Sequence, residues 1–209
     1  MRKYLLILMC AALFAVFPGC SSKNSGYSVN TSESDNIAFG DPAETGPLLM
    51  LTGGSAEPGG IAELKLSVAN TTGWTFCGLH MIYPKELDCV LEDPDDPKCN
   101  DAVYDEGEAI HASDIGIYSR RCADGFSKEV DSSRFNGIFF TTVCSNDTAT
   151  DGTIAVFKLK IPDDAVPGTK YNVDFYFADT DAFTKADDGD GSYQAKAFEN
   201  AKGTVITVR

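Results

Sequence analysis

Clusters of acidic residues are the part of this sequence most suited to chemistry, because carboxylate oxygens are preferred ligands of calcium. The densest cluster is Asp187-Asp188-Gly189-Asp190-Gly191. Read as an EF-hand loop starting at Asp188, it supplies Asp190 and Ser192 at the third and fifth positions but Tyr193 at the sixth, where the sharp turn needs glycine. The sequence therefore excludes an EF-hand here, and leaves open a looser calcium site or a solvated acidic loop.

The cysteines and histidines form no zinc-binding or catalytic pattern. Besides Cys20, five cysteines follow the N-terminal segment, and the only histidines are His80 and His111. No C-x-x-C spacing occurs among them. Three of the five occupy core-facing positions of predicted strands and are expected to be small buried hydrophobes: Cys77, Cys89 and Cys144. The candidate disulfide is Cys99 with Cys122, and the odd count leaves at least one thiol unpaired.

The sequence contains no motif of a known enzyme mechanism. It has no G-x-S-x-G, no H-E-x-x-H and no glycine-rich phosphate loop. Its 31 acids include no pair that the sequence singles out as glycosidase carboxylates. With 17 basic residues, a net charge of −14 and no basic run, the chain repels nucleic acid. We expect a protein that is not an enzyme and has no small-molecule substrate, no nucleic-acid partner, no metal site and no cofactor.

Residues 1–19 have the features of a lipoprotein signal peptide. Two basic residues begin the segment, an apolar run follows from Tyr4 to Phe17, and Gly19-Cys20 ends it. This ending resembles the lipobox of bacterial lipoproteins, in which Cys20 is lipidated and becomes the N-terminus; a plain secretory signal is the alternative. Because several acyl chains together anchor firmly, we expect an exported protein attached to the outer face of the bacterial cell membrane, through the lipid alone.

After this segment the composition changes twice. Residues 20–46 are mostly small and polar, which is typical of a flexible linker. Residues 47–209 alternate short β-type runs with turn residues and sustain no helical period. About eight or nine strands predict an all-β sandwich or jelly roll. Residues 93–131 are too long for an ordinary loop and are expected to carry a short helix or hairpin around residues 109–118. The predicted strands are Pro47–Leu51, Ala62–Ala69, Trp74–Tyr83, Leu87–Leu91, Gly137–Cys144, Thr153–Ile161, Tyr171–Ala178 and Gly203–Val208.

Three of these strands carry apolar residues on both faces, as their alternation shows. In Trp74–Tyr83 the alternate residues beginning at Cys77 suit the core, which leaves Phe76, His80 and Ile82 facing outward. The strands Gly137–Cys144 and Thr153–Ile161 follow the same pattern. A sheet with an apolar outer face is either covered by another segment or binds a partner.

Several segments resemble motifs of cohesins, the receptor modules of cellulosome assembly. Ser55–Gly60 resembles the A-x-P-G-D turn without its final acid, and Gly73–Leu87 resembles the G-i-x-x-x-x-f-x-l-x-Y-D-P-x-x-L strand without its acid. Asp151–Lys160 is similar to D-G-x-i-A-x-l-x-F-K-v. Pro167-Gly168 falls at the a-x-x-G turn, and Gly203–Val208 matches the closing G-x-I-x-V strand. The segments occur in the order that the family has.

This resemblance implies a nine-stranded jelly-roll β-sandwich that binds a dockerin module on the flat outer face of one sheet and catalyses nothing. It also implies that calcium enters with the dockerin, which holds it in EF-hand-like loops. The face would be built from the strands Trp74–Tyr83, Gly137–Cys144, Thr153–Ile161 and Gly203–Val208.

Such a face would bind by burying apolar side chains at its centre, with polar groups around them. The expected apolar contacts are Phe76, Ile82, Phe139, Val143, Ile154 and Val156. The expected polar contacts are His80, Thr141, Asn146 and Lys158.

The predicted function is that of a cell-surface adaptor whose single cohesin binds a dockerin-bearing protein, an enzyme or a scaffoldin component, for plant polysaccharide degradation. The alternative is a carbohydrate-binding β-sandwich lipoprotein. Sugar binding usually uses a planar row of exposed aromatic rings, whereas the one tryptophan, Trp74, lies near a strand start. Protein binding therefore fits the sequence better.

Overall fold

The computed structural model is composed of strands and turns. No helix occurs among the described residues, which confirms the all-β prediction. None of the described segments forms a helix long and apolar enough to cross a membrane. The predicted signal peptide, the lipidated Cys20 and the linker lie outside the described residues. The structure describes residues 47–71, 73–110, 115–122, 130–144, 149–178, 181–186, 193–196 and 201–209.

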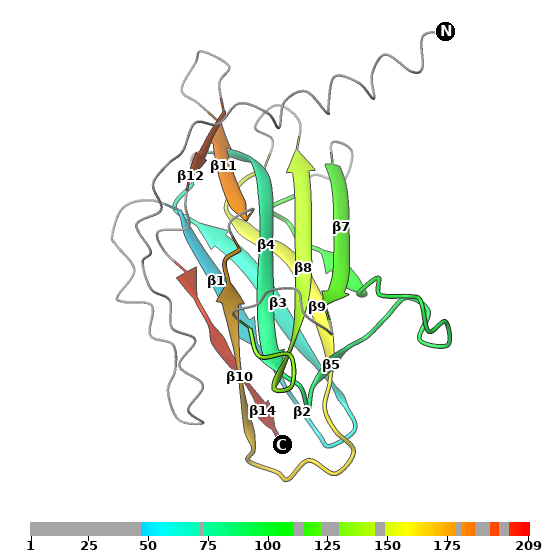
Figure 1. Ribbon diagram of the computed structural model, residues 1–209. Helices are drawn as coiled ribbons and strands as arrows, with labels where there is room; N and C mark the ends of the chain where they lie inside the picture. Colours follow the sequence, from blue (N-terminus) through cyan, green and yellow to red (C-terminus); the bar gives the residue numbers. More distant parts are fainter. Residues whose placement is uncertain are drawn as a thin grey trace, which may run out of the picture. The chain divides into compact units, whose positions relative to one another are not determined.

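Two curled sheets make up the fold (Figure 1). The first sheet has the strand order β13 (Ala201–Lys202), β1 (Leu48–Gly53), β3 (Ile61–Ala69), β9 (Gly152–Lys160) and β5 (Asp88–Cys89), and β6 (Tyr104–Glu106) also pairs with β9. The second has the order β12 (Tyr193–Lys196), β11 (Ala182–Ala186), β4 (Trp74–Pro84), β10 (Lys170–Tyr176), β14 (Thr204–Val208) and β2 (Ser55–Ala56). In addition, β8 (Phe135–Cys144) pairs with β4, and β7 (Ile115–Cys122) pairs with β8.

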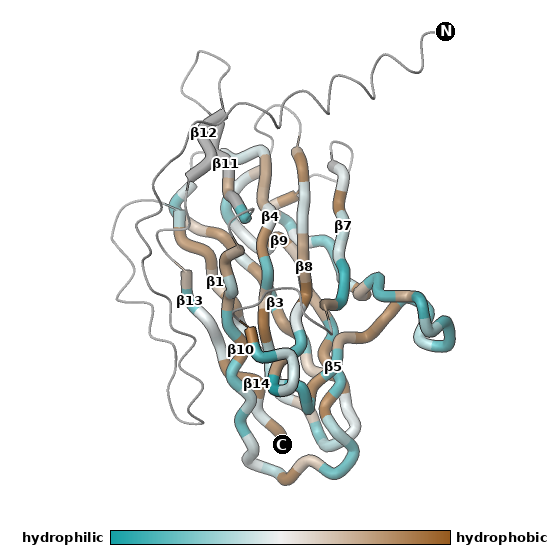
Figure 2. Tube along the Cα trace, viewed as in Figure 1, coloured by the Kyte–Doolittle hydropathy of each residue, from teal (hydrophilic) through white to brown (hydrophobic). Residues whose placement is uncertain are grey.

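The core lies between the sheets and follows from the alternation of side chains along each strand. In β4 the residues Cys77, Leu79, Met81 and Tyr83 are all fully buried, as the sequence predicts. The Phe140 ring of β8 contacts the Phe157 ring of β9 edge to face, with centroids 5.5 Å apart, and so joins the two sheets. Hydrophobic stretches run along the strands, and hydrophilic ones gather in the connections (Figure 2). Burial of this apolar area is the main stabilising contribution.

Each of the eight predicted strands has a counterpart within a few residues. The insertion at residues 93–131 contains β6 and β7, which the sequence did not predict as strands. Its described part has a turn at residues 108–110 and no helix. The insertion is attached to the first sheet, because the N–H of Gly107 donates to the carbonyl of Ile154 (3.0 Å) and the N–H of Ala109 to that of Thr153 (2.8 Å). The long segment is therefore an integral part of the sandwich.

The five described cysteines all have free thiols. Cys77, Cys89 and Cys144 are buried, which confirms that prediction. Burial raises the pKa of the Cys89 thiol to about 12, so this group stays protonated and unreactive. The predicted disulfide between Cys99 and Cys122 is not formed in the structure, and both side chains are partly exposed.

The backbone pairing next to these two cysteines leads toward opposite positions for them. Asp101 bridges to Arg120, and the N–H of Arg121 donates to the carbonyl of Asn100 at 2.6 Å. Extending this antiparallel pairing by one residue sets Cys99 against Cys122, at the kind of position where cross-strand side chains lie closest. We predict that mild oxidation of the full chain with a glutathione redox buffer links the two, as read by peptide mapping. Alkylation of both thiols after that treatment would show that they do not pair.

Candidate partner-binding face

The outward side chains of four neighbouring strands form one continuous surface on the second sheet. His80 of β4 lies opposite Phe139 of β8 and Tyr176 of β10, and Arg120 of β7 lies opposite Phe139. Residues in register share a face of the sheet. We call this surface the β4 face, which consists of the outward residues of β7 (Gly116, Tyr118, Arg120, Cys122), β8 (Phe135, Gly137, Phe139, Thr141, Val143), β4 (Phe76, Gly78, His80, Ile82) and β10 (Lys170, Asn172, Asp174, Tyr176).

A row of four rings crosses the middle of the β4 face. Ring centroids are 6.5 Å apart for Tyr118 and Phe139, 4.8 Å for Phe139 and His80, and 6.4 Å for His80 and Tyr176. The planes are inclined by 59°, 41° and 70°, so neighbouring rings are not coplanar. Tyr118 is 44% exposed, and the other three are partly exposed. The row offers aromatic surface with polar edges, a combination that is enriched in protein interfaces.

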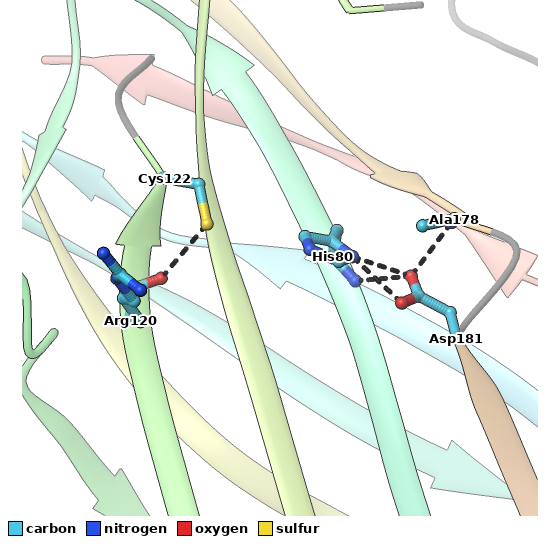
Figure 3. A network of polar contacts seen from close by, with 5 residues as sticks. All are labelled: His80, Arg120, Cys122, Ala178 and Asp181. Carbon is cyan, nitrogen blue, oxygen red and sulfur yellow. Dashed lines mark hydrogen bonds and ion pairs between the residues drawn. The ribbon is translucent and has the colours of Figure 1, made fainter. Parts of the chain in front are cut away.

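A buried carboxylate fixes the orientation of His80 within this row. The Asp181 side chain is 1% exposed, and its two oxygens lie 2.9 and 3.0 Å from Nδ1 of His80 (Figure 3). Oδ2 of Asp181 also accepts the backbone N–H groups of His80 and Ala178, each at 3.1 Å. Because a carboxylate only accepts, the proton of the imidazole is assigned to Nδ1. His80 is thus held by the chain before any partner arrives.

A second acid, Asp174, is buried at an outward position of β10. It lies opposite Ile82 and is 8% exposed, and its Oδ1 accepts the N–H of Phe175 at 2.8 Å. Burial raises the pKa of Asp174 to about 7, although the hydrogen bond from Phe175 acts in the opposite direction. Asp174 is therefore partly protonated near neutral pH, which reduces its negative charge on the β4 face.

One end of the β4 face is covered. Ile82 points outward in the register but is only 3% exposed, and Val130, just before β8, is 6% exposed; neither belongs to the main core. Nζ of Lys85 donates to the carbonyl of Ser132 at 2.8 Å, so the connection leading into β8 lies against the end of β4 (Figure 1). Ile82 is therefore an internal contact, contrary to its predicted role as an exposed one.

Most of the site residues predicted on β4 and β8 lie together on the β4 face, with outward orientation. Five of them are exposed or partly exposed there: Phe76, His80, Phe139, Thr141 and Val143. The closing strand, β14, belongs to the same sheet as expected, beside β10. Asn146 lies outside the described residues.

The predicted contribution of strand Thr153–Ile161 is wrong. This strand is β9, which pairs with β3 along its length and so belongs to the first sheet. Ile154 is fully buried, and Lys158 forms an ion pair with Asp105 at 2.9 Å. Val156 lies on the same strand, opposite Lys65 of β3. Alternation along a strand tells which residues face outward, but not which sheet the strand joins.

Sequence reasoning did not predict β7 as a strand, and it predicted β10 as a strand but did not assign it to the β4 face. Tyr118 and Arg120 come from β7, and Tyr176 comes from β10. No sequence signal linked Asp181 to His80, which is 101 residues away. The β-type residues Ile115, Ile117 and Tyr118 were the available sign of β7. No group of three or more metal-ligating side chains occurs among the described residues, and the Asp187–Gly191 cluster lies outside them.

The structure is similar to solved structures of cohesins. No family model matches the sequence, and no curated protein matches it. A type III cohesin from the cell-surface anchoring scaffoldin ScaE of Ruminococcus flavefaciens is 23% identical, with TM-score 0.55, over 79% of this chain and 89% of that one. The seventh type I cohesin of ScaB from Pseudobacteroides cellulosolvens is 14% identical, with TM-score 0.53, over 78% of this chain and 92% of that one.

A type II cohesin of ScaB from Acetivibrio cellulolyticus, solved in a complex with an X-dockerin, is 12% identical with TM-score 0.53 and covers 78% of this chain and 100% of that one. Cohesins of all three types therefore share the arrangement of the two sheets described above, although their sequences are far apart. The part of the chain that the structure describes has the cohesin fold.

Proposed function

We propose that the β4 face binds a dockerin module. The observation that carries this proposal is the four-ring row on the outer face of one sheet in a domain with the cohesin fold. Two of the similar structures, from Acetivibrio cellulolyticus and Clostridium thermocellum, are cohesins in complex with dockerins, with TM-scores of 0.51 and 0.50. A preformed, partly apolar surface of this kind suits a folded protein partner.

The wider role that we propose is that of an adaptor at the cell surface. Its support is the apolar run ending at Cys20, followed by a polar linker, as in an exported lipoprotein. Lipidation at Cys20 would anchor the domain to the membrane, and the dockerin would bring an enzyme or scaffoldin component for polysaccharide degradation. The chain itself would act by binding and would catalyse no reaction, and calcium would arrive in the dockerin.

Direct binding of polysaccharide is less compatible with the β4 face. Stacking on successive sugar rings needs aromatic side chains that present their faces in one plane. The inclinations between 41° and 70° in the row, and the buried carboxylate behind His80, do not provide such a platform. The geometry therefore favours protein over carbohydrate.

Calorimetric titration tests the proposal directly. The full chain, purified in detergent, is titrated with a panel of dockerins from the same organism, with and without calcium, and cellulose and xylan serve as controls. We expect one-to-one binding to at least one dockerin, dependent on calcium. Retention on a polysaccharide without binding to any dockerin would replace the proposal with the carbohydrate-binding alternative.

A further inference from the structure

The most exposed apolar side chains of the β4 face lie together on β7 and β8. Among the described residues, the exposed large hydrophobic ones are Ile61, Tyr118, Val143 and Val166. Ile61 belongs to the first sheet, and Val166 lies in the connection between β9 and β10. Tyr118 (44% exposed) and Val143 (53% exposed) share the β4 face, where they are diagonal neighbours, because Tyr118 lies opposite Thr141. The apolar surface that the face offers to solvent is thus concentrated on its β7–β8 side.

The position beside these two side chains is occupied by a glycine. Gly116 lies directly opposite Val143 and two residues before Tyr118, on the same side of β7. A Cβ added at Gly116 would have no described atom within 4 Å. Its backbone is not in the left-handed region, so the local conformation does not require glycine. The structure thus leaves an open position bounded by Val143 and Tyr118, which we call the Gly116 site.

A second outward glycine, Gly78 of β4, shows the contrasting case in which the chain fills the space itself. A Cβ at Gly78 would lie 2.8 Å from Cζ of Phe76, so the Phe76 ring lies over this glycine. The Tyr118 ring is also directed away from the Gly116 site, because its centroid is 6.5 Å from that of Phe139, which lies further along the face. Both rings are therefore turned toward the centre of the face, and neither covers Gly116.

The groups around the Gly116 site suit an aliphatic side chain. Its two boundaries are the methyl groups of Val143 and the side chain of Tyr118, and the outward residue between them on β8, Thr141, is also uncharged. An apolar group placed there would be removed from water without the desolvation of an ion. Neighbouring side chains on a sheet face are about 5 Å apart, so one missing side chain leaves room for one from a partner.

We infer that the Gly116 site receives an aliphatic side chain of the dockerin and is the apolar anchor of the interface on its β7–β8 side. This inference rests on the proposed function and specifies which dockerins the domain accepts. The site is continuous with the four-ring row, which begins at Tyr118, so one partner surface would cover both. A dockerin with a charged or much bulkier residue at this point would be rejected, by desolvation or by steric clash.

Gly116→Val tests the inference by filling the site from the domain's own side. Valine suits a strand better than glycine, and its Cβ meets no described atom, so urea unfolding should show a stability at least equal to that of the wild type. Calorimetric titration of the full chain with the dockerin that binds it should show an affinity lower by about 10-fold or more, because two side chains would compete for one space. Gly116→Ala, which adds only a methyl group, should give a smaller loss.

Val143→Ala tests the boundary of the site, and Val166→Ala is its matched control. Both valines are exposed, so neither substitution opens a cavity in the core. Val143→Ala should weaken dockerin binding by about 3-fold to 10-fold, because it removes apolar surface from the contact. Val166→Ala makes the same change in the connection between β9 and β10 and should leave the dissociation constant unchanged.

The outcomes separate this inference from the proposed function. If Gly116→Val binds the dockerin as tightly as the wild type or more tightly, or if Val143→Ala and Val166→Ala bind equally well, the Gly116 site is not the anchor and dockerin binding still stands. Failure of the wild type to bind any dockerin would overturn both. If Gly116→Val does not fold, as judged by circular dichroism, Gly116→Ala and Val143→Ala decide the question.

Discussion

Phe139→Asp is expected to abolish measurable dockerin binding, a loss of at least about 100-fold, while the domain remains folded. Phe139 is the second ring of the row, with its centroid 4.8 Å from that of His80 and 6.5 Å from that of Tyr118. The substitution removes the apolar centre of the contact. It also adds a carboxylate next to a ring already held by the buried Asp181, and a complex would have to desolvate that new charge.

The matched control for this substitution is Ile61→Asp. Ile61 is an apolar β-strand residue that is 47% exposed, on the first sheet and away from the β4 face. Introducing the same carboxylate there should leave the dissociation constant unchanged, as measured by calorimetry. Equal losses for Ile61→Asp and Phe139→Asp would mean that the face is assigned wrongly, provided that both variants give the wild-type circular dichroism spectrum.

Asp174→Asn should stabilise the domain near neutral pH and remove a fall in stability that the wild type shows as the pH rises. The Asp174 carboxyl has a pKa of about 7 in the folded protein, against the ordinary value of 3.8. Between about pH 4 and pH 7 the folded state therefore holds a proton that the unfolded state has released. Stability is highest below this window and decreases as the pH rises through it, by up to about 4 kcal/mol. Asparagine is close in shape, and its oxygen can still accept the N–H of Phe175.

Urea unfolding at a series of pH values between 4 and 8 measures this effect as the difference between wild type and Asp174→Asn. The difference should be small at pH 4 and should grow in favour of the variant up to neutral pH. Asp131→Asn is the control, because Asp131 is exposed and its pKa is lowered, so its removal should not flatten the decrease. A difference between wild type and Asp174→Asn that is constant across the pH range would show that Asp174 ionises normally.

The sequence predicted those features of the fold that depend on local alternation. Strand β4 is the best example, because its buried residues Cys77, Leu79, Met81 and Tyr83 and its outward residue His80 all follow from a period of two. The facing residues Phe139 and Thr141 of β8 follow in the same way. These two strands supply the centre of the candidate site, so that part of the face could be found without a structure.

The remaining part of the site depends on contacts between distant segments. Strand β9 has the same alternation as β8 yet pairs with β3, and nothing local distinguishes the two sheets. Strand β7 has a short β-type stretch, Ile115–Tyr118, followed by Ser119 and two arginines, so its pattern alone does not mark an eight-residue strand. The contact of Asp181 with His80 depends on how the chain returns after β10. The periodicity of a strand does not predict where the chain goes after the strand ends, and so it could not predict this contact.

The backbone pairing of residues 100–102 with β7 has a consequence for self-association. Without it, residues 119–121 would present unpaired N–H and C=O groups to solvent, and such edges template pairing with another molecule. The N–H of Arg121 is instead bonded to Asn100, and the carbonyl of Ser119 accepts the N–H of Ala102 at 3.3 Å. The acidic, proline-containing segment that follows β5 thus covers the edge of β7 at these residues and leaves it no free backbone groups for pairing with another molecule. This pairing protects the domain against aggregation through that edge.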